Sequence, residues 1–246
     1  MVLAAVGQLT STASMSHNLS QALTLVSKAT SAGARALFLP EAADYIASSP
    51  QESVSICRSV EDSEFVKGLR EAARKHKLPI SVGVHEPGDS KDKVKNTLLW
   101  IDEQGEIAQR YQKLHLFDVQ LKDGTTMKES NSVEPGKEMP KVFDSVVGKI
   151  GYQICFDVSW GSGQRRGNVP NTDDPQASLP RASTRIAQQR RADHHVPIGI
   201  CNTNREGALD ASLDRTRNRN RKLDHCGCTG WVPQREALQL RPQYHH

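Results

Sequence analysis

The stretch from Gly148 to Val158 constrains the fold of this chain more than any other. It reads Gly-Lys-Ile-Gly-Tyr-Gln-Ile-Cys-Phe-Asp-Val, an apolar run that ends in Cys155, with Asp157 two residues later. A short apolar run bounded by glycine is typical of a buried strand. The sequence therefore predicts a strand that presents a cysteine thiol at the edge of a sheet.

Residues 1–158 alternate predicted strands with predicted helices and then continue as hairpins. Apolar spacing and turn residues predict the strand Val2–Gln8, the helix Asn18–Ala32 with Gly33 at its C-cap, the strand Ala36–Pro40, the helix Ser63–His76, the strand Pro79–Val84, the hairpin of Lys95–Asp102 with Glu106–Tyr111, and the hairpin of Lys141–Val147 with Lys149–Phe156. The strands are too apolar for a sheet with one open face. We therefore expect an α/β fold with a mixed sheet and helices on its faces.

The charged residues change in kind after residue 158. Residues 1–158 carry 18 Lys and Arg against 20 Asp and Glu, with 13 of the cations Lys, whereas residues 159–246 carry 14 against 8, with 13 of the cations Arg. The second part is rich in Arg, Asn, Gln, Pro and Gly, a composition that cannot bury enough apolar surface to offset the cost of ordering. The sequence thus divides the chain into residues 1–158 and a largely disordered, aberrant segment, 159–246.

The chain carries no sequence signal for a membrane or for an oxidising compartment. No apolar run approaches the roughly 18–20 residues of a membrane span, and Val2–Val6 begins without a basic leader. The five cysteines (Cys57, Cys155, Cys201, Cys226 and Cys228) are too unevenly spread for a disulfide framework. We expect a cytoplasmic protein with no membrane partner, and a mitochondrial form stays open.

Three groups of complementary chemistry lie just past the ends of predicted strands: Glu41, Lys113 and Cys155. Taken singly, Cys155 is an ordinary core residue, Glu41 a cap of the next helix, and Lys113 a solvated cation. Together they supply the groups that acyl transfer needs: a thiol nucleophile, a carboxylate to take its proton, and a cation for the developing oxyanion.

The blocks around these residues resemble the signature blocks of the nitrilase superfamily of carbon–nitrogen hydrolases. The blocks are Phe38–Ala42, Tyr111–Asp118 and Ile154–Asp157; their order and separations match, and the resemblance covers residues 2–158. The resemblance implies a four-layer α-β-β-α sandwich, incomplete here because the C-terminal half departs from the family. It also implies that intact members form homo-oligomers.

Finer detail resembles one branch, the deaminated glutathione amidases. This resemblance lies in Asp44–Ala47 with Pro50, in the block His115–Val119, and in Lys128–Ser132 with Pro135-Gly136. It implies hydrolysis of deaminated glutathione to 2-oxoglutarate and cysteinylglycine. The ω-amidases, which act on α-ketoglutaramate, are the nearest alternative.

The resemblance also implies a role for each site residue. Glu41 is the general base, with a pKa raised by burial, and Cys155 attacks the amide carbonyl of a small-molecule substrate to form a thioester. Lys113 and the backbone N–H of Phe156 hold the oxyanion. Glu129 is a second carboxylate that positions the lysine and the substrate. No metal or organic cofactor is required.

After Val158 the family pattern stops, and three hypotheses compete to explain residues 159–246. In one, an Arg-rich tail around Arg215–Arg221 binds nucleic acid in a protein that is not an enzyme. In another, the motif His225–Cys228 binds a metal together with His194 and His195.

The third hypothesis, which we favour, is translation out of frame. Shifting the permitted codons of Asp193–Cys201 by one nucleotide allows IITYPSAF, and the same shift allows three further family-like strings in order as far as Tyr244. A shift also explains the change from Lys to Arg. Because the later strands that close the site would be missing, we expect weak or no turnover from this chain.

Overall fold

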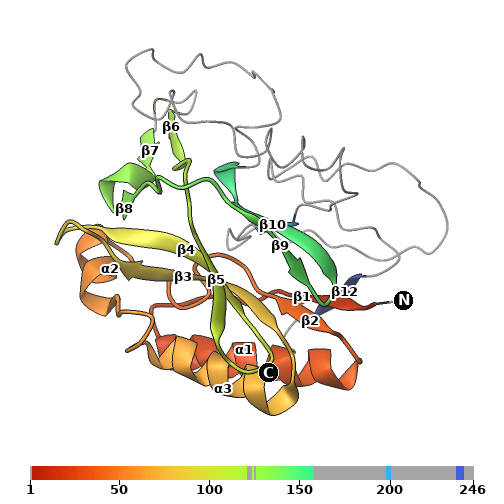
Figure 1. Cartoon of the computed structure of the whole chain (residues 1–246). Helices are drawn as coiled ribbons and strands as arrows, with labels where there is room; N and C mark the ends of the chain where they lie inside the picture. Colours follow the sequence, from red (N-terminus) through yellow and green to blue (C-terminus); the bar gives the residue numbers. More distant parts are fainter. Residues whose placement is uncertain (1, 121–123, 125, 158–197, 201–236, 241–246) are drawn as a thin grey trace.

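The computed structural model describes residues 2–120, 124, 126–157, 198–200 and 237–240, the last two ranges by their backbone alone (Figure 1). The segment predicted to be out of frame, the Arg-rich stretch and the His/Cys motif therefore lie almost entirely outside the described residues. The predicted division of the chain at residue 158 stays a prediction.

A seven-stranded mixed sheet forms the centre of the described part. Its strand order is β12-β1-β2-β3-β4-β5, with β8 paired to the first two residues of β4. The strands are β1 (Ala4–Gly7), β2 (Ala36–Phe38), β3 (Ile80–Pro87), β4 (Val94–Ile101), β5 (Ile107–Gln112), β8 (Val133–Glu134) and β12 (Ala237–Leu240). Strands β12, β1, β2 and β3 run parallel, and β3, β4 and β5 run antiparallel. The connections from β1 to β2 and from β2 to β3 pass through helices, as the alternating pattern predicted.

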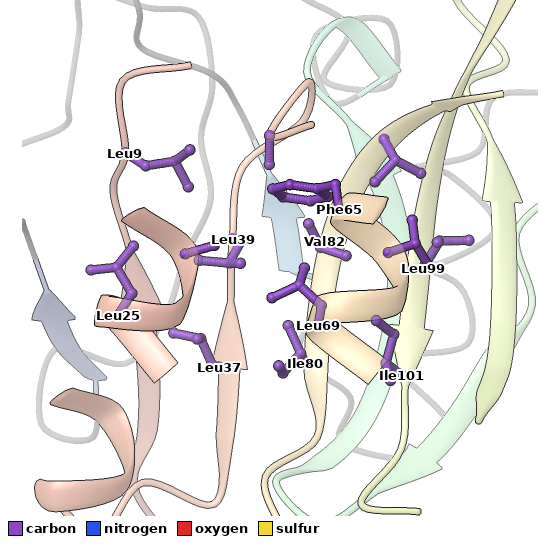
Figure 2. Close-up of a cluster of buried hydrophobic side chains, with 14 of the residues drawn as sticks. Leu9, Leu25, Leu37, Leu39, Phe65, Leu69, Ile80, Val82, Leu99 and Ile101 are labelled. Atoms are coloured by element: carbon purple, nitrogen blue, oxygen red, sulfur yellow. The ribbon is translucent and has the colours of Figure 1, made fainter. Parts of the chain in front are cut away.

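Helices α1 (Met15–Ser31) and α3 (Glu64–His76) cover one face of this sheet (Figure 1). Each begins at a serine whose hydroxyl accepts a backbone N–H of the first turn, Ser14 for α1 and Ser63 for α3. Between them in the sequence lies the short helix α2 (Pro50–Ile56), which the sequence analysis did not predict. Figure 2 shows the core that the helices bury against the sheet, with Leu9, Leu25, Leu37, Leu39, Phe65, Leu69, Ile80, Val82, Leu99 and Ile101 labelled.

The other face of the central sheet packs against a second sheet. That sheet has the order β11-β10-β9, with β9 (Val142–Ser145), β10 (Gly148–Ile154) and β11 (Ile198–Ile200). A second apolar cluster lies between the sheets and includes Phe38 and Trp100 from the first and Phe143 and Tyr152 from the second. The described layers are therefore helix, sheet and sheet, three of the four layers that the resemblance implies.

Several short elements were missed by the sequence analysis. They are β6 (Asp118–Gln120), β7 (Thr126–Lys128), the 3₁₀ turn η1 (Glu129–Asn131), β8, β11 and β12. Two of these strands, β11 and β12, lie in the segment predicted to be largely disordered, and they have three and four residues. Strand β11 pairs with β10, and strand β12 pairs with β1. Both are too short for a periodic apolar pattern that would predict a strand from the sequence.

Candidate active site

Glu41 lies just beyond the end of β2, in a backbone held by β3. The Gly83 N–H donates to Pro40 O (3.0 Å), and the Ala43 N–H donates to Gly83 O (2.9 Å). A Cβ at Gly83 would lie 2.3 Å from the Glu41 Cα, so the two backbones approach as only glycine allows. Ala42 has a φ of +50° and turns the chain sharply after the carboxylate. The loop thus holds Glu41 against the sheet.

The Glu41 carboxylate is buried, with 8% of the residue exposed. Burial raises the pKa of Glu41 to about 7, although the Lys113 ammonium lowers it. The Lys113 Nζ lies 3.5 Å from Glu41 Oε2. A carboxyl group with a pKa near 7 exchanges a proton readily at neutral pH, which suits general acid–base chemistry.

Lys113 is buried between two carboxylates at the end of β5. Its Nζ donates to both Glu129 oxygens, at 3.1 Å and 2.9 Å, besides its contact with Glu41. Burial alone would lower the pKa of Lys113, but Glu41 and Glu129 outweigh it and hold that pKa above its usual value. The side chain is therefore a fixed cation in a site with little water.

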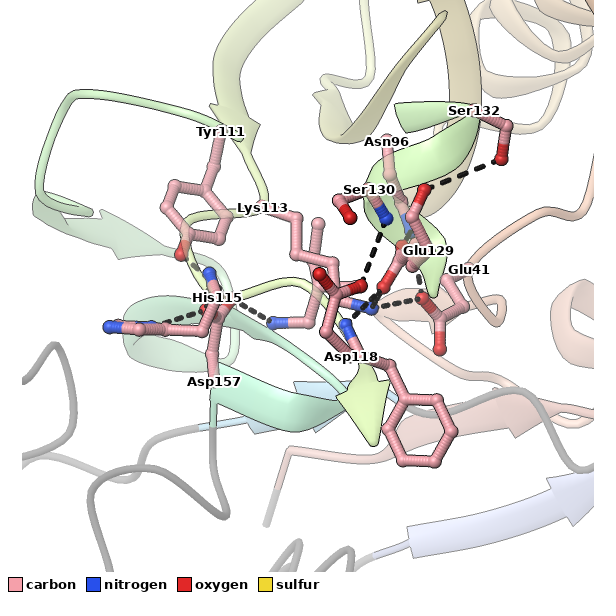
Figure 3. A network of polar contacts seen from close by, with 12 residues as sticks. Glu41, Asn96, Tyr111, Lys113, His115, Asp118, Glu129, Ser130, Ser132 and Asp157 are labelled. Atoms are coloured by element: carbon pink, nitrogen blue, oxygen red, sulfur yellow. Dashed lines mark hydrogen bonds and ion pairs between the residues drawn. The ribbon is translucent and has the colours of Figure 1, made fainter. Parts of the chain in front are cut away.

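Glu129 reaches this position through the 3₁₀ turn η1. Its Oε2 also accepts the backbone N–H of Phe117 at 2.7 Å, so the carboxylate is held by two groups of the loop after β5 (Figure 3). Spacing along the chain alone could not have shown this pairing. The structure brings Glu41, Lys113 and Glu129, which the sequence analysis selected, into one cluster, in which Glu41 and Lys113 are buried and Glu129 is half-buried.

Asn96 joins the two carboxylates and was missed by the sequence analysis. Its Nδ2 donates to Glu41 Oε2 at 2.9 Å and approaches Glu129 Oε1 at 3.4 Å (Figure 3). It lies within β4, where a polar residue reads as ordinary alternation along a strand. The signal that could have found it is its burial inside an apolar run, Val94–Ile101, since a buried amide needs partners.

Cys155 comes directly after β10 at a sharp turn, with Phe156 and Asp157 in helical conformation after it. The residue is half-buried and has a φ of +46°, a left-handed backbone conformation that residues other than glycine rarely adopt. The negative charge of a Cys155 thiolate raises the pKa of both Glu41 and Lys113. The backbone N–H of Phe156 belongs to the same turn.

Asp157 is fully buried and connects this turn to the loop that carries Lys113. It accepts hydrogen bonds from Tyr111, His115 and Ile154, which Figure 3 shows in part for Tyr111 and His115. The sequence analysis noted Asp157 beside the cysteine but assigned it no role. Its partners lie more than forty residues away in two of the three cases, so spacing could not reveal them.

A further pair, the buried Asp44 and the half-buried His85, lies beside the cluster. Asp44 Oδ1 lies 2.9 Å from His85 Nδ1, and Asp44 Oδ2 accepts the His85 backbone N–H at 2.8 Å. His85 pairs directly with Asn96 across β3 and β4, so both side chains share one face of the sheet. Burial opposes the charge on His85, but Asp44, Glu41 and Glu129 raise its pKa.

The described residues contain neither a metal-binding cluster nor a membrane span. No group of three or more His, Cys, Asp or Glu side chains among them could hold a metal ion, and the predicted His/Cys metal motif lies outside those residues. None of the helices in the described ranges is long and apolar enough to cross a membrane.

Comparison with known proteins gives one family. The model of the carbon–nitrogen hydrolase family matches residues 3–168. The chain is 42% identical over 159 residues to a protein named probable hydrolase nit2 from Schizosaccharomyces pombe, covering 64% of this chain and 58% of that one. It is 33% identical over 160 residues to the deaminated glutathione amidase of Rattus norvegicus, covering 63% and 49%.

The fold has a counterpart among solved structures. The crystal structure of the Caenorhabditis elegans NitFhit protein is similar with a TM-score of 0.63 and 26% identity, covering 84% of this chain and 53% of that one. The nitrilase-like fold predicted from the sequence is thus confirmed. The chain spans about half the length of the curated relatives it matches.

Proposed function

Because the chain belongs to the carbon–nitrogen hydrolase family, we propose that its residues 2–157 carry the catalytic half of an amidase that acts through a thioester on Cys155. The observation that carries this proposal is the cluster in which Lys113 contacts both Glu41 and Glu129, together with a cysteine at a strained turn whose charge acts on Glu41 and Lys113. A base, a nucleophile and a fixed cation are the groups that amide cleavage requires.

Acylation uses each of these groups once. Glu41 takes the proton of the Cys155 thiol, and the sulfur attacks the carbonyl carbon of the amide. Lys113 and the backbone N–H of Phe156 hold the oxyanion of the tetrahedral intermediate. The carbon–nitrogen bond then breaks, Glu41 returns the proton to the departing nitrogen, and a thioester remains on Cys155.

Deacylation reverses the roles with water in place of the amine. Glu41, again ionised, takes a proton from a water molecule, whose oxygen attacks the thioester carbonyl. The carbon–sulfur bond breaks, the carboxylic acid leaves, and the proton on Glu41 passes to the sulfur. Glu129 keeps the Lys113 ammonium in place through both steps, since its two oxygens accept hydrogen bonds from the ammonium.

The substrate that we propose is deaminated glutathione, cleaved to 2-oxoglutarate and cysteinylglycine. The similarity to deaminated glutathione amidases supports it, as do the blocks around Asp44 and Glu129 that resemble that branch. The competing substrate is α-ketoglutaramate, whose acyl half is identical and whose leaving group is ammonia. The two substrates therefore differ only in the leaving group, which is cysteinylglycine in one and ammonia in the other.

We also propose that residues 159–246 are translated in a reading frame shifted from the one that encodes the corresponding part of family members. Multiple turnover is then weak or absent, because the segments that complete the site in longer relatives are replaced. Acylation, by contrast, depends on groups that all lie within the described residues.

The test is to measure the amine released by acylation. The purified chain is mixed with deaminated glutathione, and cysteinylglycine is quantified per chain, with Cys155→Ala as the control. We expect up to one equivalent from the wild-type chain and none from the variant. Equal release from both would refute the proposed function, and faster acylation by α-ketoglutaramate would favour the ω-amidase alternative.

A further inference from the structure

Two segments carry the groups of the proposed reaction, and they are distant in the sequence. The lysine loop, Lys113–Phe117, comes directly after β5, and the cysteine turn, Ile154–Asp157, lies at the end of β10. The two strands belong to different sheets. The relative position of nucleophile and cation therefore depends on the contacts that join the loop to the turn.

Asp157 makes that connection with both of its carboxylate oxygens. Its Oδ1 accepts the backbone N–H of His115 at 2.8 Å and lies 2.8 Å from His115 Nδ1. Its Oδ2 accepts the Tyr111 hydroxyl at 2.8 Å and the backbone N–H of Ile154 at 3.0 Å. One side chain thus holds residues on both sides of Lys113, Tyr111 and His115, which Figure 3 shows, and also the residue before Cys155.

The cysteine turn needs such a restraint because its backbone is strained. A residue with a side chain at a φ of +46° persists only when the surroundings fix it. The Ile154 N–H bond fixes the turn from one side, and the ring of Phe156 packs edge-on against Phe117 at 5.5 Å on the other. Asp157 is 0% exposed, so its two side-chain oxygens take their hydrogen bonds from Tyr111, His115 and Ile154.

We propose that Asp157 is a positioning residue that fixes the Cys155 thiol relative to the Lys113 ammonium and the Glu41 carboxylate. This inference rests on the proposed function, since it presumes that Cys155 is the nucleophile. Asp157 touches neither substrate nor the reacting atoms; it acts through the backbone of the loop and of the turn.

The requirement for a carboxylate is specific. The two backbone N–H groups, of His115 and of Ile154, point at different oxygens of Asp157 and can only donate. The amide of an Asp157→Asn variant has a single oxygen, so its NH₂ group must face one of those N–H donors. The variant therefore releases either the lysine loop or the cysteine turn, whichever way the amide is oriented.

The experiment measures the rate at which iodoacetamide alkylates Cys155, site by site by mass spectrometry, from pH 5 to pH 10. Alkylation reports the thiolate, so it needs no turnover by the chain. In the wild type we expect an apparent thiol pKa below that of N-acetylcysteine. In Asp157→Asn we expect alkylation at pH 7 to be slower by about 10-fold to 100-fold, with an apparent pKa that rises, because misplacement by about 1 Å has effects of this size.

Two further variants keep the result interpretable. Asp118 is an exposed carboxylate just after the lysine loop, and its Oδ1 accepts the backbone N–H of Ser130. The Asp118→Asn variant should leave the alkylation profile of Cys155 unchanged. Tyr111→Phe keeps the ring and removes one donor to Asp157, and it should slow alkylation by about two-fold to five-fold with a modest drop in melting temperature.

The outcomes separate the two proposals. A wild-type Cys155 that reacts like N-acetylcysteine would overturn the proposed function and this role with it. A reactive wild type with unchanged profiles in Asp157→Asn and Tyr111→Phe would overturn the role of Asp157 and leave the proposed function standing. If Asp157→Asn does not fold, Tyr111→Phe decides: an unchanged profile refutes the role, and a slower one supports it.

Discussion

Replacing Glu41 by glutamine should remove a specific pH dependence from the free energy of unfolding. The pKa of Glu41 is raised from 4.5 to about 7 in the folded chain by burial. Since each pKa unit corresponds to about 1.4 kcal/mol, the difference is worth about 3 kcal/mol. This is the cost of ionising the carboxylate in its buried site.

The sign is set by the direction of the pKa change. Below pH 4.5 the carboxyl group is protonated in both states, and its contribution to stability is fully present. As the pH rises towards 7, the unfolded chain loses the proton first, so stability is lost. Relative to the wild type, Glu41→Gln should therefore gain about 3 kcal/mol of unfolding free energy between about pH 4.5 and pH 8.

The assay is urea denaturation, measured by circular dichroism at several pH values in that range. The matched control is Glu134→Gln. Burial raises the pKa of Glu134, but hydrogen bonds from the Ser90 side chain and from the backbone of Asp89 and Ser90 outweigh burial and lower it. Because the folded pKa of Glu134 lies below 4.5, its difference from the wild type should change in the opposite direction and only below about pH 4.5, and it should stay nearly constant between pH 4.5 and pH 8. A difference between Glu41→Gln and the wild type that stays constant across the range would refute the reasoning.

Three other substitutions, the first with a matched control, test the packing and the charges around the site. Gly83→Ala should destabilise the fold by about 1–3 kcal/mol, because the added Cβ clashes with the Glu41 backbone. In the control Gly68→Ala, the added Cβ contacts only a flexible leucine side chain, so the free energy of unfolding should be nearly unchanged in the same denaturation assay. Lys113→Met removes the cation that lowers the Glu41 pKa, so the loss of stability on raising the pH should extend to higher pH in the same assay. Leu69→Ala should cost about 2–5 kcal/mol in denaturant, since that side chain is fully buried between α3 and the sheet.

The regular elements could be predicted from the sequence because each carries a strong local pattern. The helix Ser63–His76 has both an apolar stripe and a serine cap, and the structure places α3 at Glu64–His76 with Ser63 as its N-cap. The hairpin around Gly105 was predicted from its turn, and that glycine has a φ of +80°. Short strands such as β6 and β7, at three residues each, carry no such pattern.

The partners of the site residues were beyond the reach of sequence patterns. Glu41, Lys113 and Cys155 could be selected because each lies just past a recognisable strand. Asn96 and Asp157, in contrast, act through hydrogen bonds to residues that fold close to them from elsewhere in the chain. The left-handed backbone of Cys155 is likewise imposed by tertiary contacts, since no local preference favours it in a residue with a side chain.

The most direct test of the central claim is to detect the acyl group on Cys155 by mass spectrometry. The chain is mixed with deaminated glutathione, quenched in acid and digested. The account predicts that the peptide containing Cys155 gains the mass of the 2-oxoglutaryl group, and that Cys155→Ala shows no adduct. The absence of any adduct on Cys155 in the folded wild-type chain, or an adduct that persists in Cys155→Ala, would contradict it.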